Sequence, residues 1–294
     1  MASELNQAQA AMIDHIKLWY ESPDIAHIRS LDFLHFESRV SEDGELLNQV
    51  AEYRNLRIKL SRNNKLEISG SIHVFCQGFN DRDFDFWEFC ETTLQLCNEL
   101  KITPEKLRIR RFEFGVNFKP PIASKRFLDS IFLYQGKHFD KETFGGRGYM
   151  LRYENSRFYI KAYDKARHAK IKGPLVRYEV GQKKMEVISE SGIQYLSDLH
   201  DPEKFASLHE LLQKRIENII MGNPYLKLQT LNPKDRAFIS GLSSRSEWEA
   251  LTTREAGRRK KRFRAIVEAN SQSILKDEFK EIVSKKWVDL MVVF

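Results

Sequence analysis

The stretch RRFEFGVNF, residues 110–118, alternates large apolar side chains with charged or polar ones. Two later stretches, RFYIKAYDKA (157–166) and LVRYEV (175–180), follow the same alternation. Successive side chains of a β-strand point to opposite faces of the sheet. The pattern therefore predicts three strands, each with one apolar face and one polar face.

The two faces of the predicted strands differ sharply in chemistry. The apolar face takes Phe112, Phe114, Val116, Phe118, Phe158, Ile160, Ala162, Val176, Tyr178 and Val180. The polar face takes Glu113, Asn117, Tyr159, Lys161, Tyr163, Lys165, Arg177 and Glu179. Carboxylates, tyrosines and lysines together on one side of a sheet indicate a site for metal-assisted chemistry on phosphate.

Length and composition indicate an ordinary globular protein. The chain has 294 residues, of which 41% are hydrophobic, enough for one large domain with or without an appendage. Cys76, Cys90 and Cys97 show neither CxxC nor zinc spacing, which favours a reducing compartment. No apolar run approaches the roughly 18 residues of a membrane span, and the first residues lack a signal-peptide core. We expect a cytoplasmic protein without membrane contact.

Positive charge is concentrated in two windows of a chain whose net charge is +7. Residues 145–184 contain eleven Lys or Arg against three Asp or Glu. Residues 251–265 contain seven against one, and the rest of the chain is net acidic. The first window covers the predicted site, and both suit a polyanionic partner. A merely solvated face is an equal alternative for the second window.

Other segments complete an α+β pattern. Residues 12–20 favour a strand, with a helix starting at Ser3 as the alternative. Turn residues, Pro, Gly and apolar spacing predict the remaining elements: strands at 31–40, 51–60 and 65–75, helices at 84–100 and 125–134, a helical region at 184–222, and helices after 231. This order predicts an antiparallel sheet with flanking helices and a helical C-terminal region.

Glu113 and Glu179 are candidate metal ligands. A carboxylate among apolar residues needs an ion pair or a bound cation, so pairing with a neighbouring arginine is the simpler alternative. Two carboxylates on adjacent strands would suit Mg²⁺ or Mn²⁺. His73, predicted on a strand, would add a nitrogen ligand.

Tyr163 is the candidate nucleophile. Its predicted neighbours on the face, Lys161 and Lys165, would favour the phenolate. A half-buried strand tyrosine between two solvated lysines is the common alternative. Tyr159, on the same face, is a second candidate, and Tyr149 and Tyr153 are more distant ones. The chain has no GxxxxGK[ST] phosphate loop.

At these residues the chain resembles the rolling-circle replication initiators of the filamentous-phage gene II type and their plasmid relatives. The resemblance rests on RIRRFEFGVNF, SRFYIKAYDKARH and GPLVRYEV in this order, with SGSIHVF and MIDHIKLWY upstream. It covers about residues 12–220. The classical group carries a His-hydrophobe-His metal pair, which this chain lacks.

The resemblance implies an enzyme that nicks and rejoins one DNA strand. Tyr163 would attack and retain the 5′ phosphate, and the freed 3′ hydroxyl would prime replication. Lys165 would be its basic partner, with Lys161 beside it. Glu113, Glu179 and His73 would hold Mg²⁺ or Mn²⁺. A host helicase and polymerase would be partners, in the cytoplasm of a bacterial host.

DNA contacts are expected from the basic windows. We expect single-stranded DNA to contact Arg147, Arg152, Arg157 and Arg177. We expect the origin duplex to contact Arg258, Arg259, Lys260 and Lys261. The expected organisation is an extension at 1–11, a nicking domain at 12–228 and a basic helical region at 229–294. A non-enzymatic nucleic-acid-binding protein and a metal nuclease that uses water remain alternatives.

Overall fold

The computed structural model describes residues 12–292, apart from 81, 145, 147 and 243–250. The predicted extension at 1–11 and the predicted DNA contact Arg147 lie outside the described residues. Within them the predicted α+β class is confirmed: a long antiparallel sheet carries flanking helices and continues into a helical C-terminal region.

The described strands form one ten-stranded sheet and one three-stranded sheet. The large sheet has the order β2-β3-β4-β5-β1-β6-β12-β11-β10-β9, and the small one has the order β13-β7-β8. Their bounds are β1 Ile13–Glu21, β2 Glu37–Val40, β3 Leu46–Tyr53, β4 Leu56–Ser61, β5 Lys65–Ser71, β6 Leu107–Phe118, β7 Ile131–Tyr134, β8 Lys137–His138, β9 Asp140–Thr143, β10 Tyr149–Glu154, β11 Phe158–Asp164, β12 Val176–Gln182 and β13 Ile219–Met221.

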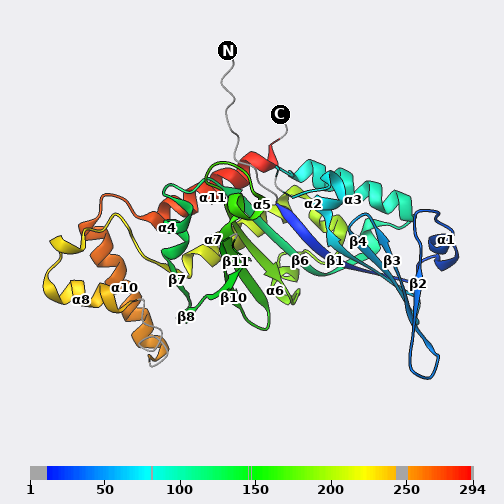
Figure 1. Cartoon of the computed structure of the whole chain (residues 1–294), viewed down its shortest axis with the longest axis horizontal. Coiled ribbons are helices and arrows are strands. Elements are labelled where there is room, and N and C mark those ends of the chain that lie inside the picture. The colour runs from blue at the N-terminus through cyan, green and yellow to red at the C-terminus, as the bar shows by residue number, and fades with distance from the viewer. Residues whose placement is uncertain (1–11, 81, 145, 147, 243–250, 293–294) are drawn as a thin grey trace, which may run out of the picture.

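Most of the α-helices precede β6 or follow β12 in the chain. Their bounds are α1 Ile25–Arg29, α2 Ile72–Gln77, α3 Phe86–Leu100, α4 Ser124–Asp129, α5 Lys165–Ala169, α6 Glu186–Ser189, α7 Pro202–Glu217, α8 Pro233–Gly241, α10 Thr253–Asn270 and α11 Leu275–Met291. The molecule is elongated, with α8 and α10 at one end and the β2–β4 strands at the other (Figure 1).

Helices α3, α7 and α11 pack on the predicted apolar face. The Phe279 ring of α11 lies with its centroid 5.3 Å from that of Phe118 and 5.2 Å from that of Tyr178. Phe205 of α7 stands between Phe86 of α3 and Trp287 of α11, with centroids 5.0 and 5.5 Å away. Burying these rings removes apolar area from water, which is the main stabilising contribution to the fold.

The C-terminal region divides between two cores. Leu275, Phe279 and Trp287 of α11 belong to the main core of the sheet. Helices α8 and α10 instead pack with β7 and β13 in smaller clusters through Phe238 and Phe263. The predicted boundary at residue 229 therefore does not separate α11 from the sheet domain in packing terms.

Two predicted strands near the N-terminus were wrong in extent. Residues 51–60 form two strands, because Arg54 adopts a φ of 54° and closes a two-residue turn between paired Tyr53 and Leu56. Of the predicted strand at 31–40, only Glu37–Val40 is extended. The chain turns between β2 and β3, where Gly44 has a φ of 79°.

Three longer predictions were right for their first part and wrong for their last residues. The predicted strand at 65–75 ends at Ser71, whose hydroxyl accepts from the Val74 amide and caps α2. His73 therefore lies on a helix and not on a strand. The predicted helix at 125–134 gives way to β7, and the predicted helical region at 184–222 ends in β13. Short apolar runs do not distinguish strand from helix, and tertiary pairing decides.

Candidate functional site on the polar face of β6, β12 and β11

The three stretches that decide the fold are neighbours in the sheet. β12 lies between β6 and β11, and all three run antiparallel. The register sets Tyr163 opposite Arg177 and Arg177 opposite Asn117. It also sets Lys161 opposite Glu179. The predicted alternation is confirmed within the strands, since the apolar set is buried against the helices and the polar set, apart from Lys165 on α5, lies on the other face.

Lys161 bridges the two carboxylates. Its Nζ lies 3.0 Å from Oε2 of Glu113 and 2.9 Å from Oε1 of Glu179. The side chains are only 16%, 13% and 3% exposed, respectively. Burial alone would lower the pKa of Lys161, but the two carboxylates outweigh it and raise that pKa. Lys161 is therefore a fixed cation at the centre of the polar face.

Arg177 is the second buried cation. Its Nε donates to Glu179, its Nη1 lies 3.1 Å from Oδ1 of Asn117, and its Nη2 lies 3.6 Å from Oδ2 of Asp14. Burial would raise the pKa of Glu179, but Arg177 and then Lys161 hold it at about 2. Glu179 is thus ionised throughout the physiological range and is a weak proton acceptor.

Two glycines make room for these side chains. A Cβ on Gly181 would overlap the ring of Tyr159, and a Cβ on Gly115 would lie 2.7 Å from Cβ of Glu179. Tyr159 therefore lies across Gly181, and its hydroxyl donates to Glu113. Glycine at these two positions leaves space for the side chains of Glu179 and Tyr159.

A β-bulge in β1 adds two residues that the sequence analysis missed. Ile13 pairs with Phe114 and Ile16 with Phe112, so Asp14 and His15 together oppose Glu113. Such a two-against-one bulge re-aims side chains. Asp14 accepts from the Ser71 hydroxyl and approaches Arg177. Burial lowers the pKa of His15 and Glu113 opposes this shift. The amino-acid sequence alone did not indicate that this part of β1 pairs with β6 beside Glu113.

Tyr163 lies in a charged but covered position. Its ring packs edge-on against Phe144 and His168, with centroids 5.8 and 5.6 Å away, and the residue is 8% exposed. The charges that act on its hydroxyl are those of Glu179, Arg177, Asp14 and Glu113. Burial raises the pKa of Tyr163 well above its usual value, so the expectation of a phenolate favoured by lysines was wrong.

The position of Lys165 is one reason why that expectation was wrong. It is the first residue of α5 and is fully buried, with Nζ 2.9 Å from Oδ1 of Asn80. Asn80 in turn donates to Asp14 over 3.3 Å. Lys165 therefore belongs to the same polar cluster but contacts the Asp14 side of it. Arg177 is the cation that faces Tyr163 and favours its phenolate form.

The three predicted metal ligands do not come together. His73 stacks on Phe84 at a centroid distance of 4.8 Å, and its Nε2 lies 3.2 Å from Gln77 Oε1. Among the described residues, no three His, Cys, Asp or Glu form a group that could hold a metal ion. Lys161 and Arg177 already neutralise Glu113 and Glu179. As they lie, these side chains do not fit Mg²⁺ or Mn²⁺.

The predicted DNA contacts differ in accessibility. Arg157, Arg258 and Lys261 are exposed, whereas Arg177 is buried in the polar cluster. Arg152 pairs with Glu154 at 2.5 Å and stands over the ring of Tyr159. Two of the predicted contacts on α10 are half-buried. They are Arg259, which donates to the Gly241 carbonyl over 3.4 Å, and Lys260. In the described part of the chain, no helix is long and apolar enough to cross a membrane.

Known proteins resemble this chain in structure only. No protein-family model matches it, and no curated protein matches it in sequence. A solved structure of a rolling circle replication initiator protein from Geobacillus stearothermophilus is similar, with a TM-score of 0.50 and 11% identity. The likeness covers 97% of this chain and 99% of the other. It shows a shared fold and confirms the fold expected from the sequence.

Proposed function

We propose that this chain is a replication initiator that nicks one strand of origin DNA and rejoins it, with Tyr163 as the nucleophile. The observation that carries the proposal is the buried row in which Tyr163 faces Arg177, with Glu179 and Asp14 acting on its hydroxyl. The fold shared with a rolling circle replication initiator supports the same function.

The cluster supplies the groups that attack on a phosphodiester needs. The Tyr163 oxygen forms a bond to phosphorus, the bond to the 3′ oxygen breaks, and the 5′ phosphate stays on the tyrosine. Arg177 stabilises negative charge that develops on the phenolic and phosphoryl oxygens. We place the tyrosine proton on Asp14, which lies beside Arg177 and whose charge acts on Tyr163. The departing 3′ oxygen takes a proton from water and becomes the 3′ hydroxyl.

No step is assigned to a divalent ion, because the carboxylates that would bind it are engaged by Lys161 and Arg177. The phosphotyrosine retains the energy of the broken bond, so rejoining needs no nucleotide cofactor. The released 3′ hydroxyl would serve a host polymerase, and a host helicase would open the duplex.

Origin binding is assigned to α10. Arg258 and Lys261 are exposed on this helix, and such residues bind phosphates with an affinity that falls with salt. Deleting residues 231–294 would remove α11 from the main core as well. Replacing Arg258 and Lys261 by Glu is therefore the cleaner variant. We expect weaker binding to origin duplex and a smaller salt dependence, without loss of fold.

The test of the nucleophile is covalent capture. The protein is incubated with labelled single-stranded origin DNA, with and without Mn²⁺, and separated by denaturing electrophoresis. A protein band carrying the label is expected for the wild type and for Tyr149→Phe, and no band for Tyr163→Phe. Tyr149 is a matched control because it is a strand tyrosine whose hydroxyl donates to Asp129, away from the cluster.

The outcomes separate the alternatives. A labelled band that persists in Tyr163→Phe and vanishes in Tyr159→Phe moves the nucleophile to Tyr159. DNA cleavage without any labelled band indicates a nuclease that uses water. Origin binding without cleavage under any condition indicates a non-enzymatic DNA-binding protein.

A further inference from the structure

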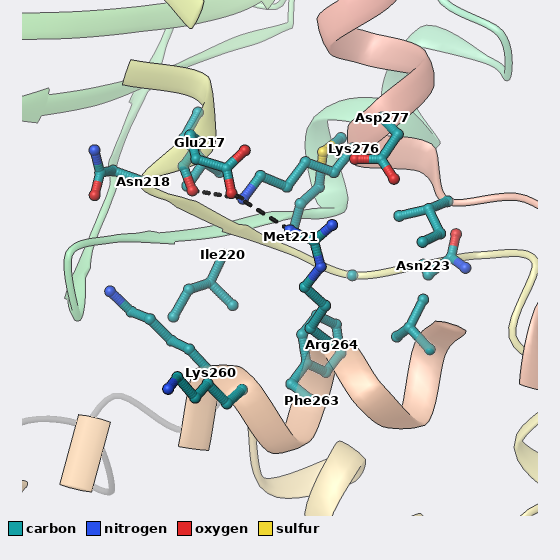
Figure 2. Close-up of a pocket in the computed structure, with 15 residues that line it drawn as sticks. Glu217, Asn218, Ile220, Met221, Asn223, Lys260, Phe263, Arg264, Lys276 and Asp277 are labelled. Atoms are coloured by element: carbon teal, nitrogen blue, oxygen red, sulfur yellow. Dashed lines mark hydrogen bonds and ion pairs between the residues drawn. The ribbon is translucent and has the colours of Figure 1, made fainter. Parts of the chain in front are cut away.

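A cavity lies outside the polar cluster, between β13, α10 and the start of α11. It has a volume of about 200 Å³. Figure 2 shows Lys260, Phe263 and Arg264 projecting from α10 toward the strand that carries Ile220 and Met221. The proposed nicking chemistry uses none of these residues.

The face of α10 that lines the cavity is defined by helical spacing. Lys260, Phe263, Arg264 and Val267 follow one another at intervals of three, one and three residues, which places them on one side of a helix. Arg258, at a different angle on the same helix, does not line the cavity. The basic helix therefore has one face toward the cavity and another toward solvent.

The interior of the cavity is mainly apolar. Ile220, Val267 and Ile274 line it together with the half-buried ring of Phe263. Pockets for drug-sized ligands measure about 300–1,000 Å³, so this cavity suits a smaller ligand with one flat ring system. Aromatic and aliphatic walls stack well on such a ring.

Basic residues line the cavity beside its apolar interior, and they differ in whether they have an anionic partner. Lys276 lies 3.5 Å from Glu217 Oε1, and Arg264 lies 3.7 Å from the same oxygen. In the part of the chain that the structure describes, Lys260 has neither an ion pair nor a hydrogen bond. It is half-buried, and burial lowers its pKa. A partly desolvated cation gains most from an anionic ligand.

We propose that this cavity binds a single nucleotide, with the base on Phe263 and Ile220 and the phosphate on Lys260. The nucleotide can belong to an unpaired DNA strand or be free, and the recognition chemistry is the same. The inference extends the proposed function, because it gives the helix assigned to origin binding a second kind of contact. It involves no cleavage step, so it is tested independently of Tyr163.

The test measures binding of deoxyadenosine monophosphate to the full chain by calorimetry. Lys260→Ala is expected to weaken binding at least tenfold, and Phe263→Leu to weaken it while keeping apolar packing. Arg254→Ala removes one positive charge from an exposed position of α10 that does not line the cavity, and it is expected to leave this binding unchanged. Deoxyadenosine without its phosphate is expected to bind more weakly than the monophosphate.

Two results would overturn the proposal: no saturable binding of the monophosphate to the wild type, or equal effects of Lys260→Ala and Arg254→Ala. A second arm uses a short oligodeoxyadenylate. If the monophosphate competes with it and Lys260→Ala weakens both, the bound nucleotide comes from a DNA strand. If only the monophosphate responds to Lys260→Ala, the ligand is a free nucleotide.

Discussion

Tyr163 and Arg177 face each other directly across the β11–β12 ladder, and both side chains are buried. The guanidinium is also held by Glu179 and Asn117. The residue proposed to attack phosphate thus lies beside a cation that cannot move away. This arrangement makes Arg177 both a stabilising group of the fold and the main positive charge near the tyrosine.

Replacing Arg177 by Met is expected to destabilise the protein strongly. The change leaves buried Glu179 with Lys161 as its remaining cation, and breaking a buried pair from one side costs about 3–5 kcal/mol. Urea unfolding monitored by circular dichroism measures this loss. Arg157→Met, at an exposed position, should stay within about 0.5 kcal/mol of the wild type. Equal stability of the two variants would contradict the role given to Arg177.

Replacing Lys161 by Met is expected to create a site for a divalent ion. Without the ammonium, Glu113 and Glu179 lie close together with no cation between them, and carboxylate oxygens bind Mn²⁺. Electron paramagnetic resonance of Mn²⁺ should show saturable binding to Lys161→Met. The wild type and Lys183→Met, whose lysine pairs with Glu154 elsewhere, should lack it. Equally tight binding by the wild type would show that a metal displaces Lys161.

Acid should destabilise the fold through His73. Burial lowers the pKa of His73 from 6.5 to about 4, so the unfolded chain binds a proton that the folded chain excludes between these values. The contribution is fully present above about pH 6.5 and is lost as pH falls toward 4. A shift of this size corresponds to at most about 3 kcal/mol.

Unfolding of wild type and His73→Gln at pH 7.5 and pH 5 measures that contribution. The wild type should lose more free energy of unfolding between the two pH values than the variant. His200→Gln serves as a comparison, since burial also lowers the pKa of His200. An identical pH dependence in wild type and His73→Gln would refute the assignment.

Removing the Phe279 ring should separate α11 from the sheet. Its centroid lies 5.1 Å from that of Phe127 as well as close to Phe118 and Tyr178, and Phe→Ala in a core costs about 3–5 kcal/mol. Thermal unfolding measures the loss. Val288→Ala, on the same helix and 53% exposed, should have little effect. A small effect of Phe279→Ala would mean that α11 is dispensable for the core.

The alternation of β6, β11 and β12 was predictable because it depends only on the two-residue period of a strand. That period assigned Glu113, Lys161 and Glu179 to one face before any partner strand was known. The α2 helix was not predictable from the same rule, because IHVFCQ has no clear period and Ser71 acts as a cap only in its folded context.

Which residues take part in the site was harder to predict than the side of the sheet on which the site lies. Asp14 reaches Arg177 through a bulge in a strand far away in the chain, and a single sequence does not report such pairing. From the sequence alone, Gly115 and Gly181 only weaken the strand patterns around them. In the structure they leave the space that Glu179 and Tyr159 occupy. Lys165 continues the alternation of β11, but the chain turns into α5 at that residue.

The position of α11 has a consequence for biosynthesis. This helix follows every strand of the sheet in the chain, and yet Phe279 covers Phe118 and Tyr178. During translation the apolar side of β6 and β12 therefore stays without that cover until residues 275–291 leave the ribosome. An interrupted chain would expose aromatic surface that attracts chaperones and proteases, so incomplete copies would be removed soon after synthesis.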